Sequence, residues 1–125
     1  MDCGDEICLV TGAAQGLGKQ MAIEFARRKA VVVMWDIQEE KLKAVASEIK
    51  EEFGSKVYAY VCDLSSREEI YKVAARVKKE VGSVSVLVNN AGVMKVHTII
   101  DAKDEDIEQT FQVNSLAHFW VSGLW

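Results

Sequence analysis

Glycine occurs at positions 12, 16 and 18, directly after an apolar run and at the start of a helical pattern. In a turn of this kind the first glycine permits a tight bend, the second lets the backbone approach a pyrophosphate, and the third lets the helix pack against the strand. The first amides of the helix then point toward the anion. We therefore predict a pyrophosphate-binding turn that comprises Gly12, Ala14, Gln15, Gly16, Leu17 and Gly18.

Two other interpretations of this segment are possible from its residues. A turn that only needs positive φ would also contain glycine, although the position between a strand and a helix makes this alternative weaker. A P-loop ends in Gly-Lys followed by Ser or Thr, and Gly18-Lys19 resembles that ending. However, Ala13 stands where a P-loop needs glycine, and Gln20 replaces the magnesium-binding hydroxyl. A P-loop is therefore excluded.

An acidic residue, Asp36, stands 18 residues after Gly18, at the end of the next apolar run. In dinucleotide sites about 20 residues separate the glycines from the acid that binds the adenosine ribose. A carboxylate there accepts the 2′-hydroxyl and repels a 2′-phosphate, so NAD is expected rather than NADP, and Ile37 joins the site. Gln15 fills the loop position where a cation would reverse this preference. Asp36 could instead cap the next helix together with Glu39.

Short apolar runs alternate with longer amphipathic stretches, which is the pattern of βαβ units. The runs are rich in Val, Ile and Leu, as in parallel strands that helices cover on both faces. Strands are predicted at Ile7–Thr11, Ala30–Trp35, Lys56–Cys62 and Val84–Asn89, and a last helix is predicted from about Asp104.

The intervening helices show apolar stripes at helical spacing. The predicted core positions are Leu17, Met21 and Phe25, then Leu42, Val45, Ala46 and Ile49, then Ile70, Val73, Ala74, Val77 and Val81. The third helix is expected to begin with a capping box made by Ser65 and Glu68.

These elements predict an α/β fold in one domain, residues 1–125. The right-handed crossover rule places the strands in one parallel sheet. We expect a Rossmann-type, doubly wound sheet with the strand order 3-2-1-4. In that order a ligand binds beyond the carboxyl ends of the first and fourth strands.

The composition narrows the class of partner. The chain has 125 residues, a net charge of −4 and no basic block, so a nucleic-acid partner is not expected. No membrane span or targeting segment is visible, and a cytoplasmic protein is expected. Cys3, Cys8 and Cys62 lack a CxxC spacing and are expected to be reduced thiols. Neither His97 nor His118 has a partner at ligand spacing, so no metal site is predicted.

Five motifs in register resemble the short-chain dehydrogenase/reductase family. They are the glycine turn, Asp36, Asp63-Leu64, Asn89-Asn90-Ala91-Gly92 and Asn114. The stretches 24–28 and 114–120 look most like the branch of retinol and hydroxysteroid dehydrogenases. The resemblance implies NAD(P)-dependent hydride transfer to or from a lipophilic alcohol or carbonyl compound. It also implies that full-length relatives associate with endoplasmic reticulum or lipid droplets.

The resemblance further implies roles for individual residues. Asp63 would accept from the adenine amino group beside the Leu64 backbone, and Asn89 would lie along the adenosine ribose. Asn114 would be the first member of a catalytic tetrad, linked through water to a lysine. The remaining motif residues, which would hold the fourth strand as well as the cofactor, are Asn90, Ala91 and Gly92.

Two of these assignments have structural alternatives. Asp63 could cap a helix together with Ser65. Asn114 could be a buried amide on the helical stripe Ile107, Phe111, Asn114, where it would need hydrogen-bond partners.

The family's catalytic Ser, Tyr and Lys are missing from the 125 residues. None of Tyr58, Tyr60 and Tyr71 is followed by Lys at the fourth position. We therefore interpret the chain as a truncated cofactor half and expect no hydride transfer by it alone. The alternatives are a non-catalytic isoform, which binds dinucleotide or forms a homo- or heterodimer, and a truncation that misfolds.

The dimer alternative depends on two surfaces. The fourth strand is expected to be an open sheet edge. The last helix is expected to expose an apolar stripe made by Val113, Leu116, Ala117, Trp120, Val121 and Leu124.

Overall fold

The computed structural model describes residues 2–95, 98 and 100–125. Four parallel strands form a sheet in the order β3-β2-β1-β4, as the sequence predicts. The strands are β1 (Ile7–Thr11), β2 (Val31–Asp36), β3 (Val57–Val61) and β4 (Val86–Val88). The fourth strand is shorter than predicted, with three residues instead of the run 84–89.

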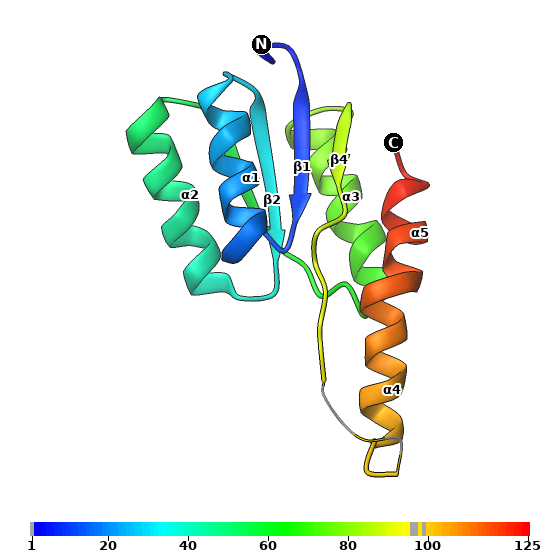
Figure 1. Ribbon diagram of the computed structural model, residues 1–125. Coiled ribbons are helices and arrows are strands. Elements are labelled where there is room, and N and C mark those ends of the chain that lie inside the picture. Colours follow the sequence, from blue (N-terminus) through cyan, green and yellow to red (C-terminus); the bar gives the residue numbers. More distant parts are fainter. Residues whose placement is uncertain (1, 96–97, 99) are drawn as a thin grey trace.

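Helices cover both faces of this sheet (Figure 1). Helices α1 (Gly16–Arg27) and α2 (Glu39–Phe53) lie on one face. Helix α3 (Arg67–Glu80) lies on the other, together with the C-terminal helical segment. That segment consists of α4 (Asp104–Phe111), the π-helical η1 (Gln112–Leu116) and α5 (Ala117–Ser122). The doubly wound α/β fold is thus confirmed.

The strands contribute to both cores because successive side chains of a strand point to opposite faces. Leu9, Val33 and Trp35 pack toward α3 and α5, whereas Val10 and Met34 pack toward α1 and α2. All five side chains are fully buried. The carboxyl ends of the strands remain at one edge of the sheet, where the connecting loops can form a site.

The apolar stripe predicted for α1 is confirmed only in part. Met21 and Phe25 are partly buried and pack against the core, whereas the prediction is wrong for Leu17. Leu17 is 64% exposed, and the buried residues of α1 are Gly18, Ala22 and Ala26. Small side chains fill this face because the helix approaches the turn after β1 closely, with the Gly12 carbonyl against Gly18. A search for large apolar residues at helical spacing misses such a contact.

The stripes of α2 and α3 are confirmed, except that Val81 follows the end of α3 and is only partly buried. The predicted capping box is displaced by one residue. Ser66 is the N-cap of α3, and its Oγ accepts from the Glu69 backbone N at 3.2 Å. Ser65 is unavailable as a cap because its N and Oγ both donate to the Asp63 carboxylate, at 2.9 and 2.7 Å.

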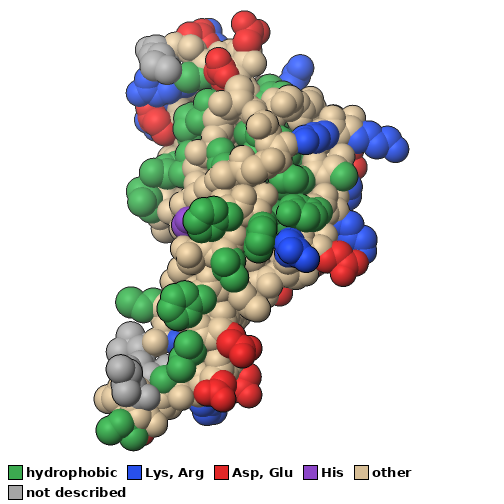
Figure 2. All heavy atoms as spheres, turned by 90° about the vertical axis from the view of Figure 1, so that its right-hand side faces the viewer, with side chains coloured by type: hydrophobic (Ala, Val, Ile, Leu, Met, Phe, Trp, Pro, Cys, Tyr) green, Lys and Arg blue, Asp and Glu red, His purple; other side chains and the backbone are tan. Residues whose placement is uncertain are grey.

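The C-terminal segment buries part of the stripe that was expected to be exposed. Val113, Ala117 and Val121 pack in the core with α3, so the prediction of exposure is wrong for them. Figure 2 shows hydrophobic side chains gathered on the side of the molecule that bears this segment. The large exposed apolar residues of the segment are Ile107, Phe111, Leu116 and Phe119.

The structure also bears on membrane-spanning helices, on the cysteines and on metal-binding groups. In the part of the chain that the structure describes, no helix has the length and apolar character needed to cross a bilayer. The three cysteines are buried, free thiols. His97 lies outside the described residues, and among those described no group of His, Cys, Asp and Glu could hold a metal ion.

Candidate functional site

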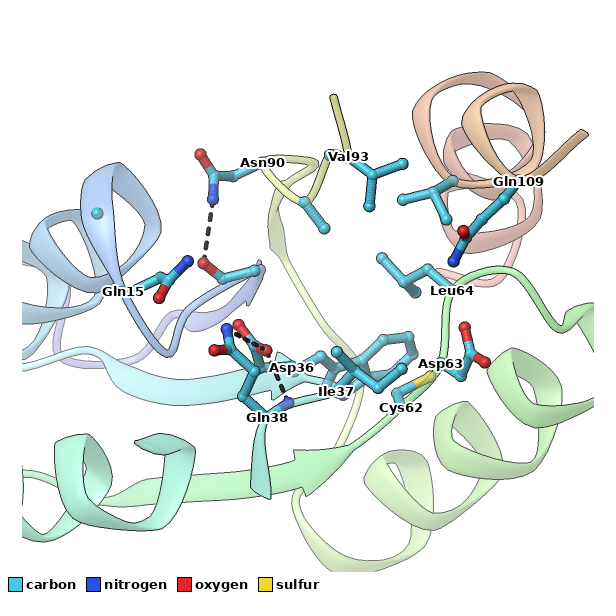
Figure 3. Close-up of a pocket in the computed structure, with 16 residues that line it drawn as sticks. Gln15, Asp36, Ile37, Gln38, Cys62, Asp63, Leu64, Asn90, Val93 and Gln109 are labelled. Atoms are coloured by element: carbon cyan, nitrogen blue, oxygen red, sulfur yellow. Dashed lines mark hydrogen bonds between the residues drawn. The ribbon is translucent and has the colours of Figure 1, made fainter. Parts of the chain in front are cut away.

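A cavity of about 490 Å³ lies beyond the carboxyl ends of the strands, where the fold predicts a ligand (Figure 3). The turn after β1, the end of β2, and the loops after β3 and β4 all contribute to it, together with the C-terminal segment. Its lining residues are Gly12, Gln15, Gly16, Trp35, Asp36, Ile37, Gln38, Cys62, Asp63, Leu64, Asn90, Ala91, Gly92, Val93, Gln109 and Val113.

Each glycine of the turn after β1 has a separate steric reason to lack a side chain. At Gly12, with φ of 67°, a Cβ would lie 2.8 Å from Ala91 Cα. At Gly18 a Cβ would lie 2.2 Å from the Gly12 carbonyl oxygen. Gly16 also has a positive φ, of 59°, but nothing lies within 4 Å of its Cβ position. Gly12 and Gly18 thus let backbone segments meet, whereas Gly16 leaves open space at the cavity.

The N-terminus of α1 offers backbone donors to this space. Its N-cap is Gln15, whose side chain makes no capping hydrogen bond, and the first turn contains no acidic residue. Among the described amides of α1, Lys19 N is the first with a backbone partner, donating to Gln15 O at 3.3 Å. The helix dipole and the free first amides favour an anion here.

Asp36 lies at the end of β2 with its carboxylate fixed by backbone donors. Oδ2 accepts from Ala14 N at 3.0 Å, and Oδ1 accepts from Gln38 N at 2.9 Å. The carboxylate is thereby tied to the glycine turn while the residue still lines the cavity. The N-cap of α2 is Gln38, so Asp36 is not the capping residue that the alternative required.

Thr11 and Asn90 join the turn after β1 to the loop after β4. Thr11 Oγ1 accepts from the backbone N of Asn90 and of Ala91, both at 3.1 Å. Asn90 Nδ2 donates to Thr11 O and to Gly12 O, at 3.1 and 3.2 Å. This network ties the two loops together at the wall of the cavity, and Figure 3 shows the Asn90 amide donating toward the turn.

The opposite end of the cavity suits an aromatic ring. Cys62, Leu64 and Val113 give it apolar walls, and the amide of Gln109 and the Asp63 carboxylate lie at its rim (Figure 3). Burial, and then the negative charges of Glu69 and Asp63, raise the pKa of the Cys62 thiol to about 12. Cys62 is therefore protonated at neutral pH and serves as wall instead of nucleophile.

Asn114 anchors the loop after β4 by a two-sided contact. Its Oδ1 accepts from Val93 N at 2.8 Å, and its Nδ2 donates to Val93 O at 2.7 Å. The residue itself is exposed within η1, and Ile107 and Phe111 are 44% and 64% exposed. The alternative of a buried amide on an apolar stripe is therefore wrong, because that stripe faces away from the core.

Four predicted cofactor residues do not line the cavity themselves. Ala14 contributes only its backbone N to Asp36, and Gly18 is buried beneath the turn. Leu17 points outward, and the Asn89 amide donates to Ser122 Oγ of α5 at 3.0 Å.

Sequence reasoning missed several lining residues, namely Trp35, Gln38, Cys62, Val93, Gln109 and Val113. Cys62 and Gln38 directly precede or follow predicted site residues, which was an available signal. Gln109 and Val113 reach the cavity from a distant helix, and no local motif marks them.

Comparison with known proteins now decides the family. The model of the family described as "short chain dehydrogenase" matches residues 6–124. The chain belongs to the short-chain dehydrogenase family. Among curated family members it is 46% identical to human "17-beta-hydroxysteroid dehydrogenase 13" over 117 residues, 94% of this chain and 39% of that protein. It is 47% identical to mouse "Epidermal retinol dehydrogenase 2" over 116 residues, 93% of this chain and 38% of that protein.

Comparison with solved structures supports the fold. The L-sorbose reductase of Gluconobacter frateurii, solved with NADPH and L-sorbose, superposes with a TM-score of 0.93 at 28% identity. The match covers 98% of this chain and 47% of the reductase. The chain spans about two-fifths of the length of the two curated relatives above.

Proposed function

We propose that the chain binds a nicotinamide adenine dinucleotide for hydride transfer between the cofactor and a lipophilic alcohol or carbonyl compound. The observation that carries this proposal is the uncapped, glycine-rich start of α1, which opens on the same cavity as the fixed carboxylate of Asp36. The free backbone amides at the start of α1 favour an anionic ligand, so a cationic or neutral ligand would leave them unexplained. A dinucleotide needs both an anion site and a ribose acceptor.

The cavity residues fit the parts of such a cofactor. The amides at the start of α1 would hold the pyrophosphate over Gly16, and Asp36 would accept from the adenosine ribose. The apolar end near Leu64 would hold the adenine, with Asp63 at its amino group. One Asp63 oxygen, Oδ1, already accepts from Ser65, and the other oxygen remains for the base.

NAD is the proposed preference over NADP. The Asp36 carboxylate carries a negative charge, and each of its two oxygens already accepts from a backbone amide. A 2′-phosphate would face that charge at short range, which costs binding free energy. The ribose hydroxyls of NAD can instead donate to the remaining lone pairs of the carboxylate.

The proposed substrate class comes from the steroid and retinol names of the relatives. Bound cofactor would supply the hydride chemistry at its nicotinamide. Within the chain, Asn114 is the proposed member of the catalytic apparatus, and it positions the loop that carries Val93. Because no tyrosine is followed by lysine at the fourth position, we expect these 125 residues to bind cofactor without turning over substrate.

Calorimetric titration of the purified chain with NAD⁺ tests the binding step. We expect one site per chain, with retinol or estradiol oxidation undetectable in the same preparation. A folded chain that gives a flat NAD⁺ titration contradicts the proposal. Oxidation of retinol or estradiol by the chain alone contradicts the expectation that it is catalytically inactive.

A second candidate is a non-catalytic binding protein that forms a homo- or heterodimer through the C-terminal segment. The apolar residues left exposed there, Ile107, Phe111, Leu116 and Phe119, favour it. Light scattering of the wild type and of Phe111→Glu separates the two cases. A dimer that the variant dissociates supports this candidate, and a monomeric wild type removes the homodimer.

A further inference from the structure

A lysine from α2 reaches the glycine turn although the turn itself contains no cation near the ribose end. Lys41 Nζ donates to Gln15 Oε1 at 3.0 Å. Gln15 holds the loop position where a cation would favour a 2′-phosphate, so Lys41 brings a positive charge to that position from 26 residues away in sequence. Gln15 is the N-cap of α1 and Lys41 lies in α2, so only the fold places the two residues together.

Lys41 is chemically free to exchange this partner. Within the described residues it forms no ion pair, in contrast to Lys19 and Lys43, which pair with Glu48 and Glu39. Its contact is a neutral amide oxygen on the protein surface. A phosphate is a stronger acceptor for an ammonium group than an amide, since both partners are charged.

The surroundings of this contact match the ribose end of the cavity. Gln15 and Gln38, the N-cap residues of α1 and α2, both line the cavity together with Asp36 (Figure 3). Gln38 Nε2 already lies 3.4 Å from Asp36 Oδ1. A substituent on the 2′-oxygen of a ribose at Asp36 would project among these two amides and the ammonium group of Lys41.

We propose that Lys41 is a specificity-determining residue that lets this site accept a 2′-phosphorylated dinucleotide beside NAD. The proposal rests on the proposed dinucleotide site and deepens it. Lys41 leaves Gln15 and pairs with the 2′-phosphate, which offsets the repulsion by the Asp36 carboxylate. NAD lacks that phosphate and makes no contact with Lys41, so the lysine affects only one of the two cofactors.

Lys43 supplies a matched control on the same helix. It lies two residues further along α2, pairs with Glu39 at 2.6 Å, and lines a different cavity. Removing either lysine changes the net charge equally. An effect of general electrostatic attraction would therefore appear in both variants, whereas direct phosphate contact appears only at Lys41.

The test is calorimetric titration of the wild type, Lys41→Ala, Lys41→Arg and Lys43→Ala with NAD⁺, NADP⁺ and 2′,5′-ADP. We expect Lys41→Ala to weaken NADP⁺ and 2′,5′-ADP about tenfold and NAD⁺ less than twofold, a loss typical of one charge-assisted contact. Lys41→Arg should restore most of the loss. Lys43→Ala should match the wild type with all three ligands.

Failure of this inference is distinct from failure of the dinucleotide site. NAD⁺ binding to the wild type without measurable NADP⁺ or 2′,5′-ADP binding overturns the role of Lys41 and leaves the site intact. Equal losses in Lys41→Ala and Lys43→Ala, or equal losses of NAD⁺ and NADP⁺ in Lys41→Ala, overturn it as well. No binding of any dinucleotide to folded wild type removes the site and the inference together.

Discussion

Helices α1 and α3 begin at the same edge of the sheet, yet their first turns are built in opposite ways. The start of α3 is closed by Ser66, whose side chain accepts from Glu69 N, and the turn contains Glu68 and Glu69. The start of α1 has no side-chain cap and no acidic residue. The protein therefore neutralises one helix N-terminus itself and leaves the other available.

This difference separates stability from binding. A side-chain cap contributes about 0.5–2 kcal/mol to a helix, so its omission at α1 lowers the stability of the unliganded fold. The omission is explained if an anion completes the turn. Gly16 supports that explanation, because the space above it is open whereas Gly12 and Gly18 are enclosed by backbone.

The largest expected effect comes from filling that open space. Gly16→Ala places a methyl group where the pyrophosphate would lie, and we expect NAD⁺ affinity to fall about 100-fold, roughly 2.7 kcal/mol. Gly54→Ala is the matched control, since Gly54 also has positive φ and an open Cβ position but ends α2 away from the cavity. Thermal unfolding should show a similar loss of stability in both variants, about 1 kcal/mol, because alanine is disfavoured in the left-handed backbone conformation. Equal NAD⁺ affinity in the two variants would contradict the proposal that the open N-terminus of α1 holds the pyrophosphate.

Converting α1 into a helix that resembles α3 should have an intermediate effect. In Gln15→Asp a carboxylate stands at the N-cap, where it satisfies a free amide and repels phosphate. We expect the unliganded chain to gain about 1 kcal/mol in unfolding free energy and NAD⁺ binding to weaken about tenfold. Gln15→Ala, measured by the same denaturation and calorimetry, removes the side chain without adding a cap. The idea fails if the Asp variant binds NAD⁺ as tightly as the Ala variant.

The smallest expected effect on binding comes from opening α3. Ser66→Ala removes the N-cap and should lower the free energy of unfolding by about 1 kcal/mol. NAD⁺ affinity should change less than twofold, because the first turn of α3 faces no proposed phosphate. Urea denaturation measures the free energy of unfolding, and calorimetry measures the NAD⁺ affinity. A tenfold loss of NAD⁺ affinity in this variant would show that α3 also binds the anion.

The strand order is confirmed, and most residues that line the candidate cavity were among those predicted, because both depend on local patterns. Alternating apolar runs fixed the sheet, and the turn at Gly12–Gly18 and Asp36 were recognisable from spacing alone. Contacts between distant segments were not visible. The contact of Lys41 with Gln15 and the position of Gln109 at the cavity depend on how the helices pack. No local sequence pattern indicates that packing.

Local errors arose where two residues compete for one role. Ser65 and Ser66 are both followed by glutamate at the third position, and the hydrogen bonds of Ser65 to Asp63 decide the choice. Leu17 fits a helical stripe, but the close approach of Gly18 to Gly12 turns the small residues of α1 inward. Both outcomes are set by packing that the one-dimensional pattern does not contain.

The most direct test of the central claim is an amide NMR titration of the chain with NAD⁺. We expect the largest shifts on the backbone amides of Gly16, Leu17 and Gly18, while the amides of Arg67 to Glu69 in the first turn of α3 change little. Saturation of the chain with NAD⁺ while the α1 amides stay unshifted would contradict it.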